Sequence, residues 1–374
     1  MSASSLPLGE LFQIEYGAAL KSDARDASGE WEVFGSAGFV GRHSDALVKN
    51  PMIVVGRKGS VGKLTFAERG GWPIDTTFYM VPKKEREISL RYTFHMLSRI
   101  SLGHLTITTS IPGLNRNDLA AVKIPVPPLD EQRRIAAILD KADAIRRKRQ
   151  QALALADDFL RSAFLEMFGD FFTNPMGWLM MPLGQLITRG PQNGLYKPST
   201  AYGSGIPIVR IDSFYNGNIN RLSHLKRVRL SAGEANTYQL GQHDILINRV
   251  NSRTHLGKCA LVPELQELTV FESNMMRLSV DDQRIHPAYL TRVLQTAFVN
   301  EQIQRRAKDA VNQASINQGD VTSFVIPLPP IRDQHKFVNL EAKLAASSEN
   351  YQLGVQQANI LFASLSQRAF RGEL

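Results

Sequence analysis

Ile124-Pro125-Val126-Pro127-Pro128-Leu129-Asp130-Glu131-Gln132 is the stretch that decides the fold. A close copy, Ile326-Pro327-Leu328-Pro329-Pro330-Ile331-Arg332-Asp333-Gln334, follows 202 residues later. At the same offset, residues 114–119 (LNRNDL) match residues 316–321 (INQGDV) without a gap. Each copy ends an apolar stretch, is interrupted by prolines and opens a long helical pattern. The repeat therefore predicts two globular units, each followed by one long helix.

The prolines indicate where the two helices begin. A proline holds the residue before it in an extended conformation and fits only the first turn of a helix. The first helix is therefore predicted to start near Leu129 and to end near Gly169, which would cap it. At 1.5 Å per residue such a helix is roughly 57 Å long.

Apolar residues in both helices recur at alternating steps of three and four, as in a coiled coil. The predicted seam comprises Ile135, Ile138, Ala142, Ile145, Ala152 and Phe159 in the first helix, and Phe337, Leu340, Leu344, Tyr351, Leu361 and Leu365 in the second. The helices are expected to pair with each other in antiparallel orientation, although each could instead pack on a separate domain. The basic run Arg146-Arg147-Lys148-Arg149 occurs in the first helix only. It could be a solvated face, a protein contact or a DNA-backbone contact.

The two globular units share an order of short apolar runs and turns. Residues 52–56 correspond to 244–248, residues 77–81 to 274–278, and the helical patterns at 92–97 and 289–294 follow in the same place. Turn residues between the runs favour an α+β fold with a mainly antiparallel sheet. The predicted divisions are a first unit at 1–123, a central helix at 124–169, a second unit at 170–325 and a C-terminal helix at 326–374. The second unit carries extra residues, notably 206–230.

Composition limits the partners and the compartment. The 374 residues carry 44 Lys and Arg against 35 Asp and Glu, a net charge of +9, which favours a polyanionic partner. The single cysteine, Cys259, excludes a disulfide framework and a multi-cysteine zinc site, and its apolar neighbours predict that it is buried. Neither a signal peptide nor a run of about 18 apolar residues is found, so a cytoplasmic protein without a membrane partner is expected.

The first unit presents basic side chains in the glycine-containing segment from Gly56 to Lys63, and the second presents them from Arg249 to Lys258. The segment from Gly56 to Lys63 lacks the glycine spacing of a phosphate-binding loop, and Leu64 stands where such a loop has Ser or Thr. Both segments are interpreted as nucleic-acid contact loops, with solvated hairpin tips as the alternative. No serine, histidine or carboxylate arrangement typical of a catalytic or metal site is found, so the chain is not expected to be an enzyme.

The paired Ile-Pro-x-Pro-Pro-x-x-x-Gln segments, each opening a long helix after a variable domain, resemble the specificity subunits of type I restriction–modification systems. The resemblance covers the whole chain. It implies two target recognition domains that read a bipartite, asymmetric double-stranded DNA sequence, and a coiled-coil pair that sets their spacing. It also implies two partner methyltransferase subunits, which bind S-adenosylmethionine, and a possible restriction subunit that uses ATP and Mg²⁺. This chain itself is expected to bind no cofactor and no metal.

In such a protein, basic groups bind phosphates while arginine and asparagine read guanine and adenine edges. The candidates for DNA binding are Lys21, Arg25, Arg42, His43, Arg57, Lys58 and Lys63 in the first unit and Tyr196, Lys197, Arg210, Arg249, Asn251, Arg253 and Thr254 in the second. Arg57, Lys58, Arg249, Asn251 and Arg253 are favoured among them. The alternative function is a non-enzymatic coiled-coil scaffold for protein partners that does not read DNA. A self-contained nuclease or methyltransferase is a more distant alternative.

Overall fold

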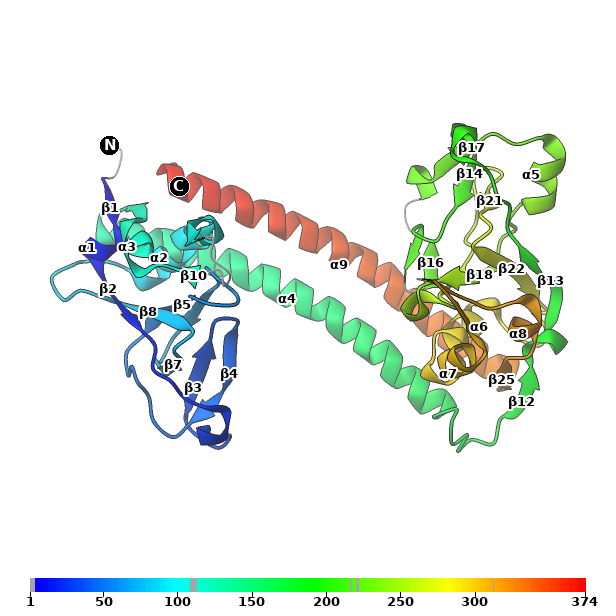
Figure 1. Cartoon of the computed structure of the whole chain (residues 1–374), viewed down its shortest axis with the longest axis horizontal. Coiled ribbons are helices and arrows are strands. Elements are labelled where there is room, and N and C mark those ends of the chain that lie inside the picture. Colours follow the sequence, from blue (N-terminus) through cyan, green and yellow to red (C-terminus); the bar gives the residue numbers. More distant parts are fainter. Residues whose placement is uncertain (1–3, 108–112, 216, 220–221, 312) are drawn as a thin grey trace. The chain divides into compact units, whose positions relative to one another are not determined.

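The computed structural model describes residues 4–107, 113–215, 217–219, 222–311 and 313–374. The chain divides into two compact units (Figure 1). Unit 1 is Met1–Leu153 with Asn350–Leu374, and unit 2 is Ala154–Glu349. The long helices α4 (Leu129–Phe168) and α9 (Ile331–Arg371) each contribute one part to each unit. The predicted start and end of α4 are confirmed, and Gly169 follows it with a φ of +76°.

Unit 1 is built on a four-stranded antiparallel sheet in the order β2-β8-β5-β6, next to a three-stranded sheet in the order β4-β3-β7. The elements are β1 (Ser5–Pro7), α1 (Leu8–Leu11), β2 (Phe12–Tyr16), β3 (Trp31–Gly35), β4 (Gly38–His43), β5 (Met52–Gly56), β6 (Leu64–Ala67), β7 (Trp72–Pro73), β8 (Thr77–Pro82), α2 (Leu90–Leu97), β9 (Thr106–Ile107), β10 (Gly113–Leu114), α3 (Arg116–Ala121) and β11 (Lys123–Pro125). The central strand β5 is buried throughout, and α2 packs on this sheet through Tyr92 and Met96.

Unit 2 repeats this plan with a larger sheet in the order β13-β22-β18-β20-β16-β15. The elements are β12 (Leu179–Pro182), β13 (Ile187–Asn193), β14 (Tyr202–Val209), β15 (Phe214–Tyr215), β16 (Gly217–Ile219), β17 (Lys226–Val228), α5 (Ala232–Tyr238), β18 (Ile245–Asn248), β19 (Val250–Asn251), β20 (Cys259–Leu261), β21 (Val270–Phe271), β22 (Met275–Val280), α6 (Pro287–Leu294), α7 (Ala297–Arg306), β23 (Lys308–Ala310), β24 (Gln313–Ser315), α8 (Gln318–Thr322) and β25 (Val325–Leu328). The extra residues 206–230 supply β15, β16, β17 and the second half of β14.

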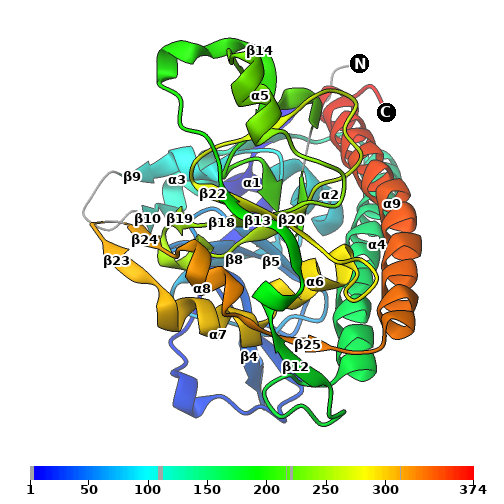
Figure 2. The ribbon, with the colours of Figure 1, turned by 90° about the vertical axis from the view of Figure 1, so that its right-hand side faces the viewer.

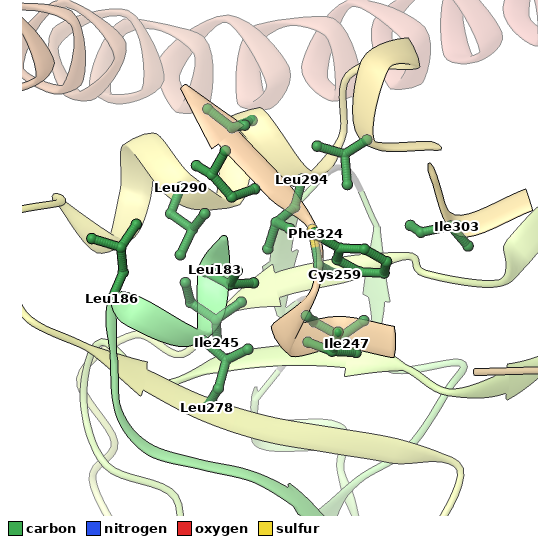
Figure 3. Close-up of a cluster of buried hydrophobic side chains, with 14 of the residues drawn as sticks. Leu183, Leu186, Ile245, Ile247, Cys259, Leu278, Leu290, Leu294, Ile303 and Phe324 are labelled. Carbon is green, nitrogen blue, oxygen red and sulfur yellow. The ribbon is translucent and has the colours of Figure 1, made fainter. Parts of the chain in front are cut away.

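The core of unit 2 lies between this sheet and helix α6. Figure 3 shows Ile245 and Leu278, from the paired strands β18 and β22, below Leu290 and Leu294 of α6. Cys259 lies in the same core, and complete burial raises the pKa of its thiol to about 12. The α+β architecture and the mainly antiparallel pairing predicted from the sequence are therefore confirmed in both units.

The repeated stretch builds the same joint in each unit. Gln132 is fully buried, and its side chain accepts a hydrogen bond from the Ser89 amide and donates one to the Pro127 carbonyl, both 2.8 Å long. Gln334 is also fully buried and makes the same bonds, both 2.8 Å, with the His286 amide and the Pro329 carbonyl. Ser89 and His286 are the N-cap residues of α2 and α6. The glutamine of the motif thus fastens the first turn of a long helix to the short helix of its unit.

The strand before each proline run is held in an equivalent way. In unit 1, β11 pairs antiparallel with β1, and the Tyr92 hydroxyl donates to the Pro125 carbonyl at 2.8 Å. In unit 2, β25 pairs antiparallel with β12, and the Tyr289 hydroxyl donates to the Pro327 carbonyl at 3.3 Å. Burial raises the pKa of both tyrosines, since each hydroxyl lies away from water. The sequence repeat is therefore a repeat of tertiary contacts.

The long helices contact each other in antiparallel orientation inside each unit. In unit 1 the start of α4 meets the end of α9, where the Arg146 guanidinium lies 4.8 Å from the Phe362 ring centre and the Arg149 guanidinium donates to the Gly354 carbonyl. In unit 2 the end of α4 meets the start of α9, where the Phe164 and Phe337 rings are 5.1 Å apart. The arginine run is therefore divided, since Arg146 and Arg149 face α9.

The predicted seam needs correction at four positions. Ile135, Ala142 and Phe337 are buried, and Ile138, Ala152, Leu340, Leu344 and Leu365 are partly buried. Ile145, Phe159, Tyr351 and Leu361 are instead exposed. In unit 1 the helices meet through Arg146 and Phe362, each one position away from an expected apolar residue, and through the polar contact of Arg149 with Gly354. A strict apolar heptad therefore does not describe this pairing.

Candidate nucleic-acid interface

The two basic loops expected to bind DNA have the same backbone geometry. In unit 1 the Gly62 amide donates to the Gly56 carbonyl at 2.8 Å, and in unit 2 the Gly257 amide donates to the Asn248 carbonyl at 2.9 Å. Gly62 and Gly257 have φ values of +76° and +75°, which glycine adopts readily. A Cβ at Gly257 would lie 2.2 Å from the Ile303 side chain. The glycine of the shared Gly-Lys pair is therefore the residue at which each loop bonds back to the end of its strand.

Arg57 and Arg249 occupy equivalent positions directly after the central strands β5 and β18. The Arg57 Nη1 donates to the Asp75 carbonyl at 3.0 Å, and the Arg249 Nη1 donates to the Ser273 carbonyl at 3.0 Å. Both guanidinium groups are thus tied to the turn that precedes the next strand of the sheet, and both side chains are half-buried. One end of each guanidinium is fixed, which would orient the remaining N–H groups for a planar acceptor.

The repeated segments at 114–119 and 316–321 hold the same two arginines from the other side. The Leu114 amide donates to the Arg57 carbonyl, and the Ile316 amide donates to the Arg249 carbonyl, each at 3.0 Å. This second repeat therefore helps to hold the Arg57 and Arg249 loops, in addition to preceding the long helices.

In unit 1, Arg57 is joined by an aromatic side chain that the sequence did not single out. The Tyr16 ring lies 5.0 Å from the Arg57 guanidinium and 5.4 Å from that of Arg116, and it is exposed. Lys58 and Lys63 are exposed on the same loop. Tyr16 ends the alternating strand β2, and this strand register was the signal that could have identified it.

In unit 2, the candidates of the second loop already have partners. The Arg253 guanidinium makes two parallel bonds to the Asp309 carboxylate, at 2.8 and 2.7 Å, which raises the pKa of the arginine and lowers that of the aspartate. The Asn251 side-chain oxygen accepts from the Ser252 amide at 2.8 Å, and the Thr254 hydroxyl lies 3.1 Å from that of Ser252. Arg253, a favoured candidate, is therefore engaged within the protein.

Tyr196, Lys197 and Arg210 line a cavity of about 430 Å³ in unit 2, together with Ser273, whose carbonyl holds Arg249. The Tyr196 side chain is 78% exposed. Lys197 pairs with Glu234 at 2.6 Å, and this contact, with hydrogen bonds from Ser231, lowers the pKa of Glu234 to about 2. The structure thus brings these three candidates next to the Arg249 loop.

The remaining candidates of unit 1 form a separate group. Arg42 and His43 lie at the end of the β3–β4 hairpin where Trp31 pairs with His43, away from the Gly35–Gly38 end that contacts loop 56–60. The Arg42 guanidinium donates to the Gly29 carbonyl at 3.4 Å, and the Arg25 guanidinium donates to the Val40 carbonyl at 2.9 Å. The His43 ring packs edge-on against the Trp72 ring, with 5.3 Å between the ring centres. Lys21 is exposed nearby in sequence. The structure does not bring this group together with Arg57.

No group of three or more His, Cys, Asp or Glu side chains is arranged to hold a metal ion in the described part of the chain. None of the helices in the described ranges is long and apolar enough to cross a membrane.

Comparison with known proteins identifies the family. The family model for the type I restriction modification DNA specificity domain matches residues 4–155 and again residues 175–343, so the chain belongs to this family. The class is that of type I restriction–modification specificity subunits. Similar proteins are the StySPI specificity subunit of Salmonella potsdam, 25% identical over 78% of this chain and 67% of its own length, and the EcoKI specificity subunit of Escherichia coli (strain K12), 26% identical over 76% and 64%. The chain therefore spans about two thirds of the length of these relatives.

A solved structure shares the fold. The specificity subunit of the type I restriction–modification system from M. genitalium superposes with a TM-score of 0.66 at 16% identity, covering 98% of this chain and 96% of that chain. A chain from a study of complex assembly and conformational transition of the type I system superposes with a TM-score of 0.52, also at 16% identity, covering 100% of this chain and 98% of that chain. The likeness agrees with two α+β units and two long helices.

Proposed function

We propose that this chain is the DNA-reading subunit of a type I restriction–modification complex and that each unit reads one half of a bipartite, asymmetric target. The observation that carries the proposal is the pair of equivalent loops, in which Arg57 and Arg249 are fixed in the same way to the central sheet of their units. The net charge of +9 suits a phosphate backbone. The side chains around the two arginines differ, which favours two different half-sites.

The recognition segments in this proposal are residues 1–123 and 170–325, and the helical segments are residues 124–169 and 326–374. The buried Gln132 and Gln334 fasten the start of each long helix to its unit. The length of the helices would therefore determine the distance between the two half-sites. The number of unread base pairs between half-sites would therefore follow helix length.

Exposed apolar side chains on the long helices support a role in assembly. Leu155, Phe159 and Leu165 of α4 are exposed in unit 2, and Leu353, Ile360 and Leu361 of α9 are exposed in unit 1. Apolar side chains that gather on a surface are typical of protein interfaces. They suit docking of two methyltransferase subunits, and a restriction subunit would join that complex.

The chemistry in this proposal belongs to the partners. S-adenosylmethionine would be held by the methyltransferase subunits, and ATP and Mg²⁺ by a restriction subunit, while this chain contributes recognition and no catalytic residue. The complex would act on DNA in the cytoplasm.

The test is long-read sequencing of adenine methylation in cells that express this chain with the methyltransferase of the same system. A methylated motif of two short half-sites with a fixed gap is expected. A soluble, active methyltransferase complex that leaves no such motif would contradict the proposal and would favour the alternative of a protein-interaction scaffold.

A further inference from the structure

The Arg249 loop of unit 2 is one edge of a small sheet that the sequence did not predict. β19, within this loop, pairs antiparallel with β24, and β24 pairs antiparallel with β23, so Lys308–Ala310 and Gln313–Ser315 are the two strands of a hairpin (Figure 2). Val250 lies opposite Ser315, and Asn251 lies opposite Ala314. The hairpin and the basic loop are therefore a single three-stranded unit.

An ion pair fixes the base of this hairpin. Arg253 of the loop makes the two parallel bonds with Asp309 of β23, and the Gln304 side-chain amide donates to the Arg253 carbonyl at 3.0 Å. A bidentate arginine–carboxylate pair fixes both distance and orientation. Arg253 and Asp309 thus set the direction of the hairpin relative to the loop.

The hairpin projects an apolar side chain into solvent. Val311, which directly follows β23, is 92% exposed, and all three residues of β23 are exposed. No contact within the described part of the chain accounts for a valine in this position. The surrounding residues 248–258 and 297–315 carry six Lys and Arg against two Asp and Glu. This positive charge suits a polyanionic partner.

We propose that the β23–β24 hairpin is a second base-reading element of unit 2, beside Arg249, and enters the major groove of the target DNA. The major groove, about 12 Å wide, admits a two-stranded ribbon, and apolar side chains there contact the thymine methyl group. Val311 and Gln313 face the base edges, and Arg253 acts as a positioning residue that holds the hairpin through Asp309. This inference rests on the proposed function and names an element, besides Arg249, that carries specificity in one half-site.

The first experiment replaces Val311 with asparagine in the full chain and maps methylated motifs with its methyltransferase partner. Because the side chain is 92% exposed, the substitution leaves the fold intact. The expected result is a changed base preference at one or two positions of a single half-site, with the other half-site and the gap unchanged. An unchanged motif would overturn the inference.

The second experiment separates positioning from direct contact by charge reversal. Arg253→Asp and Asp309→Arg should each lower the methylation rate at the native motif roughly tenfold or more, as expected when a base contact is lost. The double variant should recover most of the rate, because the pair is rebuilt in reverse. If the double variant stays as slow as Arg253→Asp, then Arg253 touches DNA itself and the positioning role is wrong.

A matched control exists in the same unit. Arg227 and Glu267 form another exposed bidentate pair, at 3.1 and 2.6 Å, on β17 and the loop before β21. Reversing this pair should leave the motif and the rate unchanged, and an equal loss would mean that the hairpin pair has no special role. Absence of any motif from the wild-type chain would overturn the proposed function itself, whereas a wild-type motif with an insensitive Val311 would overturn only the hairpin inference.

Discussion

Replacing Gln132 with leucine should loosen the joint between α4 and unit 1. The side chain is fully buried, and its two 2.8 Å bonds satisfy the Ser89 amide and the Pro127 carbonyl. A leucine of similar size would fill the space but bond to neither group. Leaving a buried polar group without a partner costs about 1–3 kcal/mol. Because two groups lose their partner and the added apolar burial offsets part of the cost, we expect the free energy of unfolding to fall by about 2–4 kcal/mol.

Urea unfolding combined with hydrogen exchange provides the assay. The expected result is earlier unfolding of unit 1 and a large loss of protection at the Ser89 amide, with unit 2 unchanged. Gln334→Leu should unfold unit 2 earlier and remove protection at the His286 amide, because Gln334 makes the equivalent two bonds there. Gln151→Leu is the control, since Gln151 lies exposed on the same helix, and leucine and glutamine have similar helix propensities. If Gln132→Leu unfolds like Gln151→Leu and the Ser89 amide stays protected, the account of the motif is wrong.

Further outcomes concern recognition, spacing and the core. Arg57→Ala should relax one half-site of the methylated motif and Arg249→Ala the other, whereas an equal loss over all sequences would indicate phosphate contacts. Removing seven residues from each long helix should shorten the gap by about three base pairs, at 1.5 Å per residue and 3.4 Å per base pair, and leave both half-sites unchanged; altered half-sites would contradict this. Gly257→Ala should lower the midpoint of thermal unfolding, because φ is +75° and the new Cβ would lie 2.2 Å from the Ile303 side chain, and an unchanged midpoint would be inconsistent with the strained loop. Cys259 should resist thiol reagents at pH 8 until the protein unfolds, since burial raises its pKa to about 12, and rapid labelling of the native chain would refute its burial.

Much of the fold could be predicted because the residues of the repeated stretch determine local structure directly. The prolines place the start of α4 at Leu129, and the offset between Gln132 and Gln334 marks two side chains that make the same buried bonds. Apolar runs predicted the central strands β5 and β18, which are buried on both faces.

The seam could be predicted only in part, because polar groups take part in it. Arg149 reaches the Gly354 carbonyl, and a Cβ at Gly354 would lie 3.0 Å from that guanidinium. The heptad positions fall on Arg149 and Gly354, but a count of apolar residues treats the arginine as an interruption and the glycine as a weak position. It includes Ile145 and Tyr351, which are exposed.

The candidate site shows a similar limit. The order of basic residues after a strand identified the loops of Arg57 and Arg249, because this pattern is local in sequence. The partner of Arg253 is 56 residues away, and the hairpin that holds Asp309 has strands of three residues with little apolar pattern. Contacts of this kind depend on tertiary structure and leave no periodic signal.

The central claim is that each unit reads its own half of the target. The most direct test replaces residues 170–325 with the corresponding segment of another specificity subunit of known motif and maps adenine methylation by long-read sequencing. A motif in which one half-site changes to that of the donor, while the other half-site and the gap persist, is the predicted result. A motif that changes in both halves, or in neither half while methylation continues, would contradict the account.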